Sequence, residues 1–77
     1  MIKYIATFYS HYEALTFKKY LEGINITGTL ISVPRSLSSS CGTCCQFFAD
    51  SPTLEMKEKV EALYQAVCTD WVCVYGK

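Results

Sequence analysis

The sequence predicts an α+β fold of the ferredoxin-like type, in which a four-stranded antiparallel sheet carries two helices on one face. Four short segments are rich in β-branched and aromatic residues, as strands are, and two segments between them carry helix-start signals. Their order along the chain is strand, helix, strand, strand, helix, strand (βαββαβ). With 77 residues, the chain has room for one small domain that spans residues 1–77.

The first strand and the first helix are predicted at the start of the chain. Residues 2–9 are rich in β-branched and aromatic side chains, which is typical of a buried strand. Ser10 and Glu13 form a capping-box pattern, in which side chains satisfy the free backbone N–H groups, so we expect the helix to begin at His11. Gly23 is placed to end this helix in a left-handed turn.

Two further strands enclose the most unusual stretch of the chain. Residues 26–33 are predicted to form the second strand, with Pro34 at its end, and residues 45–49 to form the third. Between them, three of the five cysteines fall within five residues, behind a run of serines. Loops held by a rigid scaffold often carry binding and reactive residues, so we expect the chemistry of the protein in this loop.

The last part of the chain is predicted to contain a second helix and a fourth strand. Residues 50–52, Asp-Ser-Pro, carry a helix-start signal. Apolar residues then follow at helical spacing at Met56, Val60, Leu63, Tyr64 and Val67. The charged residues within 57–61 would lie on the opposite, solvated side of this helix. Residues 71–75 alternate in the manner of a strand.

The topology predicts which residues meet at one edge of the sheet. Right-handed crossovers make the first two strands parallel, with the third between them and the fourth beyond the first. The loop of serines and cysteines then lies where the first strand ends and the first helix begins. We expect the following residues to share this rim: Thr7, Ser10, His11, Cys41, Cys44 and Cys68. Cys73 should lie further down the sheet.

Composition and charge narrow the functional classes. Seven basic and seven acidic residues balance, and no cluster of Lys and Arg indicates nucleic-acid binding. No apolar run approaches the roughly 20 residues needed to span a bilayer, and residues 1–5 lack the features of a signal peptide. We therefore expect a cytoplasmic protein without a membrane partner. Its five cysteines should be reduced, because disulfides are rare in that compartment and the number is odd.

Cys41 is the leading candidate for a reactive thiol, because it lies in an otherwise polar loop. A thiol reacts as its thiolate, and a helix N-terminus or a cationic neighbour lowers its pKa. The N-terminus of the first helix would supply such a field. The residues expected to bind an anionic sulfur group are Ser10, His11, Arg35, Ser38, Ser40 and Gly42.

Two other interpretations of the thiols stay open. Cys41 and Cys44 form a C-x-x-C pair, in which Cys44 would be the resolving thiol of a redox protein or sensor. A metal site would use Cys41, Cys44 and Cys45, with His11 or Cys68 as a fourth ligand. However, neighbouring side chains point in opposite directions if they belong to a strand, which disfavours a shared metal ion.

Structural roles explain the remaining candidates. Free cysteines are often small buried residues, and we expect this of Cys68 and Cys73. His11, in the first turn of a helix, is also typical of a solvated surface residue. Arg35 is equally suited to covering apolar surface at the end of a strand.

Residues 4–10, 12–15, 33–35 and 38–42 together carry a family resemblance. Their most specific part is Pro-Arg-x-x-Ser-x-Ser-Cys-Gly, which begins at Pro34. Over essentially its whole length the sequence resembles the small bacterial family of selenium/sulfur carrier-like domains. The resemblance implies a cysteine that holds sulfur or selenium as a persulfide or perselenide, and this role falls to Cys41. Cys44 and Cys45 depart from the family pattern, in which apolar residues usually follow the Cys-Gly.

The sequence thus favours a carrier or accessory protein over an autonomous enzyme. It needs no cofactor other than sulfur or selenium held covalently, and its partners would be proteins that donate and accept that atom. The two helices should leave one face of the sheet uncovered. Because aromatic residues are abundant, we predict a homodimer through that open face.

Overall fold

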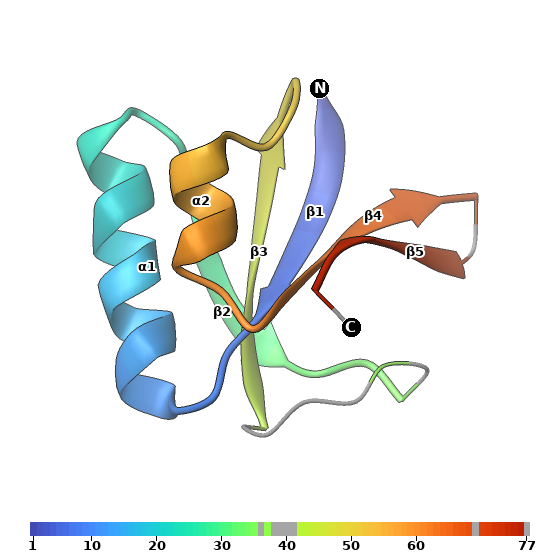
Figure 1. The fold of residues 1–77 in the computed structure, drawn as a ribbon, viewed down its shortest axis with the longest axis horizontal. Coiled ribbons are helices and arrows are strands. Elements are labelled where there is room, and N and C mark those ends of the chain that lie inside the picture. The colour runs from blue at the N-terminus through green and yellow to red at the C-terminus, as the bar shows by residue number, and fades with distance from the viewer. Residues whose placement is uncertain (36, 38–41, 69, 77) are drawn as a thin grey trace.

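The computed structural model describes residues 1–35, 37, 42–68 and 70–76, which form an α+β structure with two helices and a five-stranded antiparallel sheet. The elements in chain order are β1 (Ile2–Thr7), α1 (His11–Gly23), β2 (Thr29–Ser32), β3 (Thr43–Ala49), α2 (Leu54–Glu58), β4 (Ala62–Val67) and β5 (Asp70–Tyr75). Both helices lie on the same side of the sheet, whereas the hairpin of β4 and β5 extends away from them (Figure 1).

The sheet has the strand order β2-β3-β1-β4-β5, and every neighbouring pair is antiparallel. As predicted, the third strand lies between the first and the second, which therefore run parallel to each other. The predicted number of four strands is wrong, because a fifth strand extends the sheet. The ferredoxin-like arrangement is not confirmed.

The largest error of the sequence prediction concerns the second helix. α2 has five residues, and Thr53 caps it by accepting a hydrogen bond from the Met56 backbone N–H at 3.2 Å. Residues 62–67, predicted as the second half of a helix, instead form β4 along the free edge of β1. Their apolar spacing suits a helix, but pairing with β1 satisfies that strand's backbone groups and overrides the local pattern. The strand predicted at 71–75 exists as β5, beside β4 rather than β1.

The first helix begins where predicted and ends differently. Ser10 is its N-cap, and its side chain accepts a hydrogen bond from the Glu13 backbone N–H at 3.3 Å. Glu13 in turn accepts a hydrogen bond from the Tyr9 backbone N–H at 3.0 Å, so the carboxylate reaches one residue further than in a simple capping box. At the C-terminus Asn25, with φ of 64°, adopts the left-handed conformation that was predicted for Gly23. Asparagine tolerates this conformation because its side chain can bond locally.

The core fills the space between the helices and one face of the sheet. Four aromatic rings are its centre: Phe17 of α1 lies with its ring centroid 5.3 Å from that of Phe8 and 5.7 Å from that of Phe47, which stacks on Tyr4. Met56 of α2 is also buried in this cluster. Alternate side chains of β1 and β3 therefore pack against both helices on one face of the sheet.

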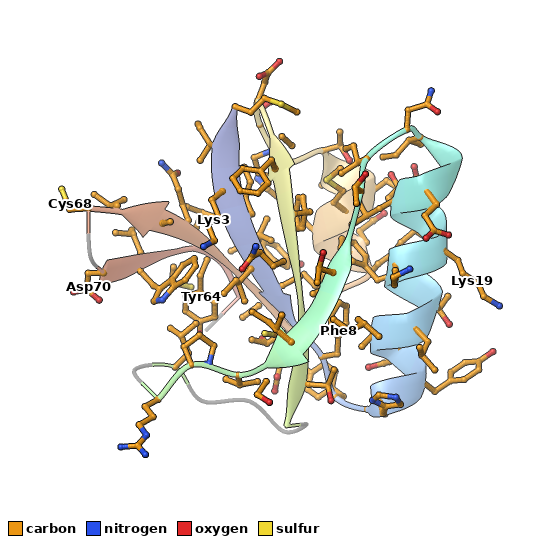
Figure 2. The ribbon with its side chains drawn as sticks, turned by 180° about the vertical axis from the view of Figure 1, so that it is seen from behind. Lys3, Phe8, Lys19, Tyr64, Cys68 and Asp70 are labelled. Atoms are coloured by element: carbon orange, nitrogen blue, oxygen red, sulfur yellow. The ribbon has the colours of Figure 1, made fainter. Side chains whose placement is uncertain are left out.

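The face of the sheet away from the helices is less exposed to solvent than expected for a two-layer sandwich. Ile5, Thr7 and Cys44 alternate with the core residues of β1 and β3, yet they too are fully buried. Figure 2 views the molecule from this side and shows Lys3 and Tyr64 on adjacent strands.

Phe47 and Phe48 give a matched test of this arrangement, because they are neighbours in β3 with 1% and 46% of their surface exposed. Replacing Phe47 with alanine should lower the free energy of unfolding by about 3–5 kcal/mol, through lost burial and the cavity left behind. Phe48→Ala should cost less than about 1 kcal/mol. Urea denaturation of the two variants measures both values, and equal losses would contradict the assigned faces.

Candidate functional site

The candidate site is the rim of the sheet where β1 ends, α1 begins and β3 starts. Thr7, the last residue of β1, lies opposite Cys44 of β3 and opposite Ala62 of β4. The Thr7 hydroxyl is buried and donates a hydrogen bond to the Ala62 carbonyl oxygen at 3.4 Å. This hydrogen bond and the strand pairing on both sides hold the end of β1 in place.

The first helix is joined to β3 at this rim. His11 Nδ1, in the first turn of α1, lies 3.3 Å from Thr43 Oγ1 at the start of β3. Both side chains are polar, and Thr43 directly follows Gly42 in the chain. The contact therefore fixes the end of the serine and cysteine loop against the helix N-terminus, where the helix dipole is positive. It confirms the prediction that His11 lies beside the end of the loop.

A backbone hydrogen bond joins the two ends of the loop, and a turn follows its first end. The Val33 backbone N–H donates to the Gly42 carbonyl oxygen at 3.2 Å, one step beyond the last pair of β2 and β3. The Leu37 backbone N–H donates to the Pro34 carbonyl oxygen at 3.0 Å, which forms a turn that carries Arg35, an exposed residue. The predicted site residues Ser38, Ser40 and Cys41 lie outside the described residues.

Cys44 and Cys45 project from opposite faces of β3, as expected for neighbours in a strand. Cys44 is fully buried on the face away from the helices, and its thiol donates to the Ser32 carbonyl oxygen at 3.8 Å. Cys45 is buried in the core against α1, where a Cβ added to Gly28 would lie 2.9 Å from its sulfur. One metal ion therefore cannot take both thiols in this geometry. Among the described residues, no group of three or more His, Cys, Asp and Glu side chains could hold a metal ion.

Burial also makes Cys45 a poor nucleophile. Removal from water disfavours the thiolate and, together with the nearby Cys44 thiol, raises the pKa of Cys45 from its ordinary value of 9.0 to about 11. At neutral pH the Cys45 thiol is therefore protonated, and its role is to fill the core beside Gly28.

Cys68 and Cys73 were predicted to be buried, and this prediction is wrong. Both are exposed. Cys68 also lies outside the rim, because residues 62–67 form β4 and carry the chain to the far end of β1. It lies in the turn between β4 and β5 with φ of 56°, at the outer end of the hairpin (Figure 2).

A buried carboxylate at the rim was missed by the sequence prediction. Glu61 was placed on the solvated face of a helix, but only 5% of its surface is exposed. Its backbone N–H donates to the Thr7 carbonyl oxygen at 2.7 Å, which places the residue beside the end of β1. No pattern in the sequence separates Glu61 from the exposed Glu55 and Glu58, because its burial follows from the start of β4.

A family model described as "Putative Se/S carrier protein-like" matches residues 3–66. The chain belongs to this family. No curated protein and no solved structure matches the chain.

The Se/S carrier-like match places most of the structure within the family. It runs from β1 nearly to the end of β4, so it includes the rim and the loop that contains Cys41. β5 lies outside the matched residues. None of the helices in the described part of this Se/S carrier-like chain is long and apolar enough to cross a membrane.

The cysteines of the described segments should differ sharply in reactivity. With iodoacetamide at pH 8, Cys68 and Cys73 should be alkylated in the native protein, whereas Cys44 and Cys45 should be protected by burial. For Cys45, the raised pKa alone lowers the thiolate fraction by about 100-fold. Peptide mass mapping before and after addition of urea measures each site. Alkylation of native Cys45 at the rate of Cys73 would contradict the assignment.

Proposed function

We propose that this protein carries sulfur or selenium, with the Cys41 thiol holding the atom as a persulfide or perselenide. The family match supports this proposal most directly, because it spans the Pro-Arg-x-x-Ser-x-Ser-Cys-Gly motif that contains Cys41. Cys41 also differs from Cys44 and Cys45 in its polar sequence context. Those two neighbours are buried, which leaves Cys41 as the favoured thiol of the cluster.

The proposed transfer is a thiol–persulfide exchange. The Cys41 thiolate attacks the outer sulfur of a donor protein's persulfide, and the donor's sulfur–sulfur bond breaks. The donor cysteine leaves as a thiolate, and Cys41 becomes the persulfide. The reaction needs no external oxidant, because a sulfane sulfur moves from one thiolate to another. To pass the atom on, an acceptor thiolate attacks the outer sulfur of the Cys41 persulfide, and Cys41 leaves as a thiolate.

The rim is suited to stabilise the anionic sulfur. α1 is capped by Ser10 and points its N-terminus at the end of the loop through the His11–Thr43 contact. A helix N-terminus favours a thiolate by lowering its pKa. Arg35, in the turn after β2, adds a positive charge on the other arm of the same loop.

The alternative, a redox pair of Cys41 and Cys44, has less support. Cys44 is fully buried, and its thiol is directed at the Ser32 carbonyl oxygen. A resolving thiol has to reach its partner and react as a thiolate, and burial opposes both. A three-thiol metal site has the further difficulty that Cys44 and Cys45 lie on opposite faces of β3.

The carrier proposal also defines the partners and the compartment. A carrier with a single reactive thiol needs one protein that supplies the atom and another that takes it. A free thiolate persists in a reducing compartment, so we place the protein in the cytoplasm.

Incubation with a persulfide donor, such as a cysteine desulfurase with cysteine, tests the proposal. The intact protein should gain about 32 Da, reversed by dithiothreitol, because the thiolate takes up one sulfur atom. Cys41→Ser should abolish the gain. Cys73→Ser is the matched control, because it removes an exposed cysteine that the proposal does not use.

Peptide mapping locates the added sulfur. Labelling confined to Cys68 or Cys73, or labelling that persists in the Cys41→Ser variant, would refute the assignment. A Cys41–Cys44 disulfide formed in place of the adduct would favour the redox pair.

A further inference from the structure

β5 is one of the two edge strands of the sheet, and all of its residues except Trp71 are exposed. Its neighbour is β4, and the hairpin extends away from both helices (Figure 1). Val72 is 49% exposed, and Cys73, Val74 and Tyr75 are exposed as well. A strand of β-branched and aromatic residues is typical of a sheet interior, so this edge has the composition of a strand with a further neighbour.

The free edge of β5 lacks two of the common protections against pairing. Exposed edges are commonly blocked by lysine or proline within the strand, and β5 contains neither. The opposite edge of the sheet differs, because β2 has four residues, begins and ends with Thr29 and Ser32, and packs on α1. β5 is therefore the edge that is suited to accept another strand.

We propose that β5 pairs antiparallel with β5 of a second copy of this chain, across a two-fold axis near Cys73. The sequence of the strand supports a second copy as the occupant. Trp71-Val72-Cys73-Val74-Tyr75 reads aromatic, valine, cysteine, valine, aromatic, and is therefore nearly the same in both directions. In a two-fold interface residue i of one copy contacts residue j of the other, and residue j contacts residue i, so a strand that reads alike in both directions places residues of like kind opposite each other.

Antiparallel pairing about Cys73 places favourable residues opposite each other. Val72 of one copy faces Val74 of the other, and Trp71 faces Tyr75, the β-branched and aromatic pairs that stabilise sheets. The register of β5 on β4 shifts between Leu63, which is paired with Tyr75, and Tyr64, which is paired with Cys73, so Val74 lies at an irregularity of the strand next to the proposed axis.

This dimer uses the edge of the sheet rather than the open face predicted from the sequence. It joins two five-stranded sheets into one continuous sheet. β5 lies outside the residues matched by the family model, so the inference is independent of the proposed carrier function.

Charge substitutions on the exposed valines test the interface. The double variant Val72→Lys with Val74→Lys sets like charges opposite each other, and so does the pair Val72→Glu with Val74→Glu. In sedimentation equilibrium, the wild-type chain should be a dimer, and each double variant should be a monomer with a dissociation constant raised at least tenfold. A one-to-one mixture should restore a dimer, because lysine then faces glutamate. This recovery separates loss of the interface from loss of folding, and a monomeric wild-type chain at micromolar concentration would overturn the proposal.

Cross-linking tests the position of the axis. The short thiol cross-linker dibromobimane should join Cys73 to Cys73 of the second copy, because residues directly opposite in antiparallel strands have Cβ atoms about 5 Å apart. Cys68 is the matched control: it is also exposed, but its two copies would lie about 30 Å apart at opposite ends of the paired strands. A dimer that cross-links through Cys68, or that survives both charge variants unchanged, would show that another surface is used.

Discussion

β1 hydrogen-bonds along both edges, to β3 on one side and β4 on the other, and the rest of the structure depends on this double pairing. The pairing sets Thr7 opposite Cys44 and Ala62, and so gathers the start of β3, the start of β4 and the N-terminus of α1 at one rim. It also determines the faces of the sheet. One set of alternating residues meets the helices, and the other set includes the buried Cys44.

The first half of the fold follows from local signals, and the second half does not. Ser10 and Glu13 predict the start of α1 because a cap acts within a few residues. β4 could not be found in this way, because residues 62–67 have an apolar spacing that fits a helix, and only the unpaired edge of β1 makes them a strand. The burial of Glu61 and the exposure of Cys68 were missed for the same reason, since both follow from where β4 begins and ends. The position of His11 beside the end of the loop was predictable, because it depends only on the order of β1, α1 and β3.

The structure divides the cysteines into classes that the sequence could not separate. Cys44 and Cys45 are buried on opposite faces of one strand, and Cys68 and Cys73 are exposed on the β4–β5 hairpin. Burial raises the pKa of Cys45 and leaves it a packing residue. In our proposal the polar loop supplies the reactive thiol, the helix N-terminus and Arg35 stabilise its charge, and the hairpin joins two copies.

The mass of the intact protein, purified anaerobically without reductant, is the most direct test of whether Cys41 carries sulfur or selenium. We expect an added sulfur, about 32 Da, or an added selenium, released by dithiothreitol and mapped to Cys41, because a persulfide is a covalent adduct of the thiolate. Loss of two hydrogens in a Cys41–Cys44 disulfide, or an adduct on another cysteine, would contradict this expectation.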